Sequence, residues 1–110
     1  MTVYEVIDIT DAKSIFVYNE PFQETFFLLQ VDREDATKVN GLVWDAIGDC
    51  EVERIVVENN IMEVFIDEEY ISIDTEWDKS GKIDFYELEN QKADEEIVEL
   101  ADSLGIYIVN

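Results

Sequence analysis

The sequence contains no histidine, one cysteine, one proline and only seven Lys and Arg residues in 110 positions. Without histidine, the chain lacks the residue most often used as a general base, a metal ligand or a triad partner. A single cysteine, Cys50, excludes a disulfide within the chain. Its acidic neighbours Asp49 and Glu51 are expected to raise the pKa of the thiol and weaken it as a nucleophile. We therefore expect no enzymatic activity, no catalytic residues, and no bound metal or cofactor.

The scarcity of basic residues excludes a class of ligands. The sequence has no basic patch and no phosphate-binding glycine loop, and nucleic acids and anionic membranes repel a chain of this charge. Residues 1–13 include three acids and no long apolar run, so they predict neither a signal peptide nor a membrane anchor. These features predict a cytoplasmic protein.

Negative charge is what the sequence has in excess: 28 Asp and Glu residues give a formal net charge of −21. An acidic chain that stays unfolded is poor in apolar residues, whereas 47% of this chain is hydrophobic and 12% is aromatic. We expect a single acidic α+β domain over residues 1–110 with its acids on the surface. Residues 45–102 hold 20 acids and 4 bases, so the charge is expected to concentrate there. The aromatic residues expected in the core are Phe22, Phe26, Phe27, Trp44, Phe65, Trp77 and Phe85, and any that stay exposed would help to anchor a partner.

The pattern of apolar residues predicts a mostly antiparallel sheet with two helices packed on it. The expected strands are rich in branched and aromatic residues and cover Val3–Ile9, Ile15–Tyr18, Glu24–Val31, Val52–Glu58, Ile61–Asp67, Tyr70–Trp77, Lys82–Glu89 and Ile106–Val109. The fourth to seventh of them are expected to form a meander with tight turns. One helix is expected to begin at a capping Asp32 and end at Gly48, and the other to run from Gln91 to Leu104.

Two acidic stretches are candidates for binding a partner. One is a face of the last predicted helix, with Asp94, Glu95, Glu96, Glu99 and Asp102. Like charges at positions i and i+4 destabilise a helix by a few tenths of a kcal/mol per pair, and no basic residue after Lys92 relieves them. The other stretch is a predicted strand with its flanking turns, and its acids are Asp67, Glu68, Glu69, Asp74, Glu76 and Asp78. A partner that uses these acids explains the arrangement, and a merely solvated acidic face is the alternative.

The stretch Glu76–Glu87 resembles a twelve-residue EF-hand calcium loop, with polar or acidic residues at most ligand positions. Its first position is Glu76 where Asp is expected, and the preceding Tyr70–Trp77 alternates like a strand, not a helix. A β-hairpin that turns at residues 78–81 accounts for the same residues. The hairpin is the preferred interpretation and a calcium site is the alternative.

In overall character the chain resembles the DNA-mimic inhibitor proteins of phages and mobile elements, which are small, extremely acidic and aromatic-rich. The resemblance covers composition alone, because those families share no motif. It implies an inhibitor that occludes the basic DNA-binding surface of a host protein. The preferred target is a histone-like, nucleoid-associated protein such as HU, and otherwise a defence nuclease. A homodimer would extend the negative surface. The alternatives are an immunity protein that inhibits a basic nuclease toxin, an acidic calcium-binding module, or an acidic domain with no such role.

Overall fold

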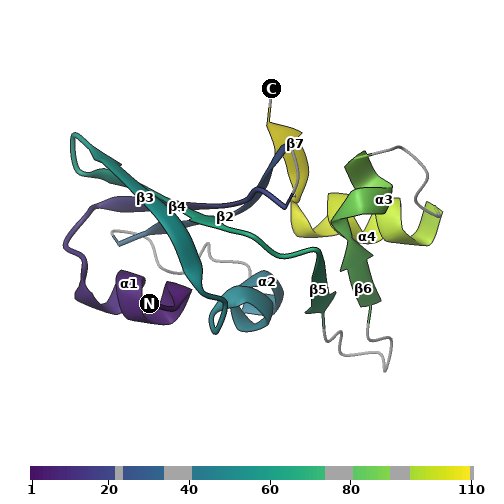
Figure 1. Ribbon diagram of the computed structural model, residues 1–110, viewed down its shortest axis with the longest axis horizontal. Coiled ribbons are helices and arrows are strands. Elements are labelled where there is room, and N and C mark those ends of the chain that lie inside the picture. Colours follow the sequence, from purple (N-terminus) through teal and green to yellow (C-terminus); the bar gives the residue numbers. More distant parts are fainter. Residues whose placement is uncertain (22–23, 34–40, 74–80, 90–94, 110) are drawn as a thin grey trace.

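A computed structural model gives the structure of residues 1–21, 24–33, 41–73, 81–89 and 95–109, which form a mixed α+β fold (Figure 1). Its largest element is a five-stranded sheet with the strand order β3-β4-β1-β2-β7. These strands are β1 (Ser14–Asn19), β2 (Thr25–Asp32), β3 (Val52–Glu58), β4 (Ile61–Ile66) and β7 (Tyr107–Val109). All neighbours are antiparallel except β1 and β4, which run parallel. The predicted α+β class with a mostly antiparallel sheet is confirmed.

Two short helices, α1 (Val3–Ile9) and α2 (Gly41–Ile47), cover one face of this sheet (Figure 1). Each contributes two buried side chains to the core, Val3 and Val6 from α1 and Val43 and Ile47 from α2. The buried side chains of β1 and β4 that belong to the same core are Ile15, Val17, Met62, Val64 and Ile66. In β1, buried and half-buried residues alternate, so the sheet has a core face and an outer face.

The predicted strand at Val3–Ile9 is wrong, although its β-branched residues favour one. Thr2 and Glu5 form a capping box: the Glu5 N–H donates to Thr2 Oγ1 at 3.2 Å, and the Thr2 N–H donates to Glu5 Oε1 at 3.1 Å. The hydrogen bond from the Thr2 N–H also holds the pKa of Glu5 below its ordinary value. Because Val3 and Val6 lie three residues apart, the helix presents one apolar face to the core.

A second sheet pairs β5 (Tyr70–Ile73) with β6 (Gly81–Asp84), and the last helices are α3 (Phe85–Glu89) and α4 (Glu95–Leu104). The expected meander is therefore wrong at one pairing: β3 pairs with β4 and β5 with β6 as predicted, but the second neighbour of β4 is β1 and not β5. Phe26 of β2 packs on Phe85 with ring centroids 4.9 Å apart. This contact joins the core of the large sheet to the small one.

The strand expected over Lys82–Glu89 ends at Asp84. The Asp84 carboxylate accepts hydrogen bonds from the N–H groups of Tyr86 (3.0 Å) and Glu87 (3.2 Å), so it caps α3 and ends the strand. Asp32, the predicted start of the first helix, is the last residue of β2, and residues 34–40, where that helix is expected to begin, lie outside the described residues.

Several helix ends and turns agree with the local sequence pattern. The first predicted helix ends as expected, with α2 finishing at Ile47 directly before Gly48. The turn at Asn59–Asn60 has φ angles of 51° and 68°, as a tight hairpin turn requires. Gly105, with φ of 77°, ends α4. The predicted start of that helix lies outside the described residues. Of the predicted turn at residues 78–81 only Gly81 is described, and it is the first residue of β6, paired with Ile73, so its place in the turn was predicted wrongly.

Candidate functional site

The acids predicted to bind a partner fall on two parts of the fold. Asp67, Glu68 and Glu69 follow β4, with Glu68 half-buried and the other two exposed. The acids on α4 are all exposed: Glu95, Glu96, Glu99 and Asp102. Because α4 packs against β6, its acids belong to the small sheet's side of the molecule. Four further predicted residues lie outside the described residues: Asp74, Glu76, Asp78 and Asp94.

The fold brings the Asp67–Glu69 turn together with acids that lie outside the two predicted acidic stretches. Because β1 and β4 run parallel, both strands finish at the same end of the sheet, and the antiparallel strands β2 and β3 begin there. At this end Ile66 of β4 pairs with Asn19 of β1 on one side and with Val52 of β3 on the other. Eight acids occupy these strand ends and adjoining turns: Glu20, Glu24, Asp49, Glu51, Glu53, Asp67, Glu68 and Glu69. We call them the strand-end cluster. Four neighbouring strands at a spacing of about 4.8 Å spread it over roughly 15 Å.

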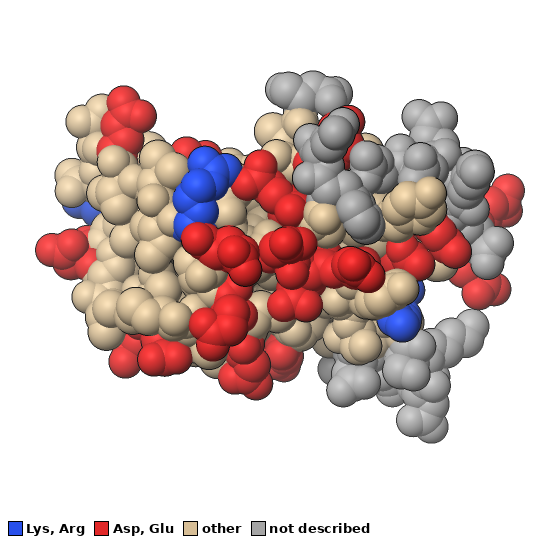
Figure 2. Space-filling model, in the orientation of Figure 1, with Lys and Arg blue, Asp and Glu red and all other residues tan. Residues whose placement is uncertain are grey.

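Within the described chain, two cationic groups pair with this cluster. Arg54 Nη2 lies 2.6 Å from Glu20 Oε1, and the amino group of Met1 lies 3.1 Å from Glu51 Oε2. Figure 2 shows Asp and Glu side chains in a band over the ends of β3 and β4, with Lys and Arg at its margins. Among the described residues, most of the cluster therefore has no partner cation and is available to an external one.

The turn that carries Asp67–Glu69 is held by Asn19, a fully buried polar side chain at the end of β1. Its Nδ2 donates to the Glu68 carbonyl oxygen and its Oδ1 accepts from the Glu68 N–H, both at 2.8 Å. Both polar groups of the buried amide are thus satisfied. The amide gives the acidic turn a fixed backbone, so its carboxylates are presented from an ordered position.

Cys50 also contacts Glu68. Burial raises the pKa of the Cys50 thiol to about 12, and the charge of Glu68, its hydrogen bond with the thiol and the charge of Asp49 add to the shift. The predicted direction of this pKa shift is confirmed. The acids that contribute to it are Asp49, as predicted, and Glu68, which is distant in the sequence, whereas the neighbouring Glu51 does not contribute. At neutral pH the thiol is protonated and donates to the carboxylate.

We expect Cys50 to react slowly with iodoacetamide at pH 8, because the thiolate is the nucleophile. Glu68→Gln should raise the rate, about tenfold for each unit by which the thiol pKa falls, whereas Asp11→Asn, an exposed change elsewhere, should not. Since the pKa in the folded state lies above the ordinary 9.0, this thiol stabilises the fold below pH 9, and that contribution is lost as the pH rises toward 12.

Mass spectrometry of the native protein measures the rates at which iodoacetamide modifies Cys50. Equal rates for the protein and Glu68→Gln would contradict the contact.

The outer face of the large sheet carries a row of aromatic rings. Tyr18 of β1 stacks on Phe65 of β4 at 5.2 Å and meets Phe27 of β2 edge-on at 5.9 Å, and Phe27 stacks on Tyr107 of β7 at 5.1 Å. We call Tyr18, Phe27, Phe65 and Tyr107 the outer aromatic row. Phe65 is buried as expected, Phe27 is half-buried, and 56% of Tyr107 is exposed. Of the other predicted core aromatics, Phe26 and Phe85 are buried, Trp44 is half-buried, and Phe22 and Trp77 lie outside the described residues.

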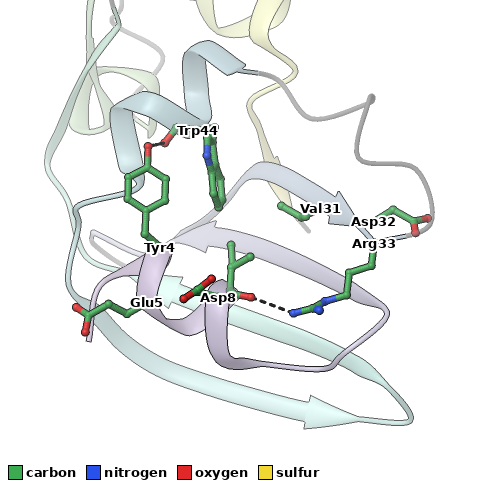
Figure 3. Close-up of a pocket in the computed structure, with 8 residues that line it drawn as sticks. Tyr4, Glu5, Asp8, Val31, Asp32, Arg33 and Trp44 are labelled. Carbon is green, nitrogen blue, oxygen red and sulfur yellow. Dashed lines mark hydrogen bonds between the residues drawn. The ribbon is translucent and has the colours of Figure 1, made fainter.

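A cleft of about 600 Å³ opens on the opposite side, between α1, α2 and the end of β2 (Figure 3). Tyr4 packs edge-on against Trp44 with ring centroids 4.8 Å apart, and its hydroxyl donates to the Trp44 carbonyl oxygen at 3.4 Å. Arg33 donates to the carbonyl oxygens of Ile7 (3.0 Å) and Thr10. The hydroxyl and guanidinium of this cleft are therefore engaged within the protein, and no predicted site residue lines it.

The carboxylates of the described residues are not arranged as a metal site. No three His, Cys, Asp or Glu side chains among them gather as a metal site would require, so the strand-end carboxylates are spread along the surface and do not converge. Of the calcium-loop-like stretch Glu76–Glu87, only the part from Gly81 is described, and there the Asp84 carboxylate caps α3.

The chain matches no protein-family model, and neither a curated protein nor a solved structure matches it. None of the described helices has the length and apolar character needed to cross a bilayer.

Proposed function

We propose that this protein is a DNA mimic that binds the basic DNA-binding surface of a host protein and occludes it. The observation that carries the proposal is the strand-end cluster, in which eight acids along four strand ends meet two cationic groups of the described chain. A duplex also presents negative charges in a spread array, which basic proteins neutralise with Lys and Arg. Carboxylates that are spread, ordered and, within the described structure, mostly without a paired cation can take the place of those phosphates.

The mechanism we infer is competitive occlusion. The negative field steers the basic partner toward the acidic surface and raises the rate of association. The carboxylates then pair with the Lys and Arg that otherwise hold phosphates. Our preferred target is a small histone-like nucleoid protein such as HU, because such a protein binds DNA through shape and charge more than through base contacts. A defence nuclease is the second choice, and the site of action is the host cytoplasm.

A displacement assay tests this proposal. A fluorescent duplex bound to purified HU should be released as the acidic protein is added, with a fall in fluorescence anisotropy. The apparent affinity should drop steeply between about 50 and 200 mM salt, as it does for phosphate contacts. Competition should be mutual, so that excess duplex releases a fluorescently labelled copy of the acidic protein from HU. Binding that leaves the duplex in place, or no binding at low salt, would overturn mimicry of DNA toward this target.

The outer aromatic row favours one second candidate, an immunity protein that plugs a basic nuclease toxin. Tight cognate interfaces concentrate their binding energy in aromatic anchors, and 56% of the Tyr107 surface is exposed. Such a complex would resist both high salt and competing duplex. The same titration, repeated with a nuclease toxin at about 0.5 M salt, therefore separates the two functions.

A further inference from the structure

One arginine of this protein, Arg54, stacks on a ring of the outer aromatic row. The Arg54 guanidinium lies 3.9 Å from the centre of the Phe65 ring, while its Nη2 pairs with Glu20 at 2.6 Å. The β3 end of the row thus joins an aromatic face, a carboxylate and a guanidinium. Arginine suits this setting because its planar group stacks on a ring while its N–H groups reach a carboxylate.

The other rings of the outer aromatic row also have carboxylates nearby, but no described cation lies over them. Tyr18, Phe27 and Tyr107 continue the row across β1, β2 and β7, and no described Lys or Arg lies over these three rings. Burial and the nearby charge of Glu63 on β4 raise the pKa of the Tyr18 hydroxyl, and Glu63 lies opposite Phe16 in the parallel pairing. Glu24 precedes Thr25, the β2 residue that pairs with Val109 of β7.

We propose that the outer sheet face is a docking surface for an arginine-rich segment of the basic partner, with guanidinium groups stacked on Phe27 and Tyr107 and paired with flanking carboxylates. The inference rests on the proposed function and adds a preference to it. A surface that acts through charge alone binds Lys and Arg equally well. A surface that also offers ring faces prefers Arg, since the ammonium of Lys is a compact and strongly hydrated charge.

The experiment compares fluorescein-labelled octa-arginine and octa-lysine, two peptides of equal charge, by anisotropy at about 150 mM salt. We expect octa-arginine to bind several-fold more tightly, and Tyr107→Ala to reduce that ratio by about threefold to fivefold. Tyr107→Phe, which retains the ring, should keep the ratio. Tyr86→Ala is the matched control, because Tyr86 on α3 is also 56% exposed. A second variant, Phe27→Leu, removes the neighbouring ring at similar volume.

Three results would overturn the inference. If both peptides bind equally and Tyr107→Ala changes neither, the surface acts by charge and the DNA-mimic proposal stands without this docking face. If Tyr86→Ala reduces the ratio as much as Tyr107→Ala does, the preference does not arise at the outer aromatic row. If neither peptide binds while HU still releases its duplex, the docking face fails and the proposed function survives.

Discussion

Replacing Glu53, Asp67 and Glu69 by their amides is expected to weaken binding to HU by about tenfold to a hundredfold at low salt. Each of the three side chains is exposed, and in the described structure none is in an ion pair. Each lost contact with a partner cation costs roughly 0.5 to 1 kcal/mol, so three together give an effect of this size. The loss should appear mainly in the association rate and shrink above about 0.3 M salt.

The matched control removes three acids from α4 by changing Glu95, Glu99 and Asp102 to their amides. Both triple variants lose the same charge from exposed positions, so any long-range steering falls equally in the two. If the strand-end cluster is the contact surface, its variant weakens binding the more. An equal or larger effect of the α4 variant would move the contact surface to that helix. Urea denaturation of both variants checks that the fold is retained, since neutralising crowded acids relieves repulsion.

The features predicted well from the sequence are those set by neighbouring residues. The helix α4 ends at Leu104 as predicted, with Ala101 and Leu104 buried on one face and Gly105 following, because helical periodicity and a left-handed glycine are local signals. Where two local signals compete, the prediction failed. The β-branched residues of Val3–Ile9 led to the prediction of a strand, but the capping box of Thr2 and Glu5, which is also present in the sequence, starts a helix there.

The candidate site depends on pairing between distant strands, which no local pattern encodes. The parallel alignment of β1 with β4 brings Glu20 beside the turn after Ile66, while the acids read from the sequence were those adjacent along the chain. The contact between Cys50 and Glu68 was not predicted for the same reason, because the two residues are distant in the sequence. Strand pairing is decided by which faces the core buries, so the strand-end cluster follows from the tertiary fold.

Asn19 shows how a polar residue can be misread from sequence. In the stretch Asn19–Pro21 it looks like an ordinary turn residue, yet its side chain is fully buried and bonds both backbone groups of Glu68. A buried polar group that loses its partner costs about 1 to 3 kcal/mol. Asn19→Ala is therefore expected to lower the free energy of unfolding by about 2 to 4 kcal/mol, measured by urea denaturation at pH 7.

Ser103→Ala is the control for a hydrogen bond without burial. Ser103 Oγ donates to the Leu100 carbonyl oxygen at 2.8 Å, the same length as the Asn19 bonds, but Ser103 is exposed. Its loss should cost less than about 0.5 kcal/mol. Equal costs for the two alanine variants would mean that water replaces the Asn19 amide and that the acidic turn does not depend on it.

Asn19→Asp makes the same position sensitive to pH. The new carboxylate can still accept from the Glu68 N–H, but its second oxygen faces the Glu68 carbonyl and cannot donate. Burial and the neighbouring acids favour its neutral form, so its pKa in the folded state lies above the usual value of about 3.9. The loss of stability relative to the unmodified protein should then be small below about pH 4 and grow as the pH rises through that raised pKa. The deficit of Asn19→Ala, which has no titrating group, should stay constant over the same range. A deficit of Asn19→Asp that is also independent of pH would place the new carboxyl in solvent and contradict the buried contact with Glu68.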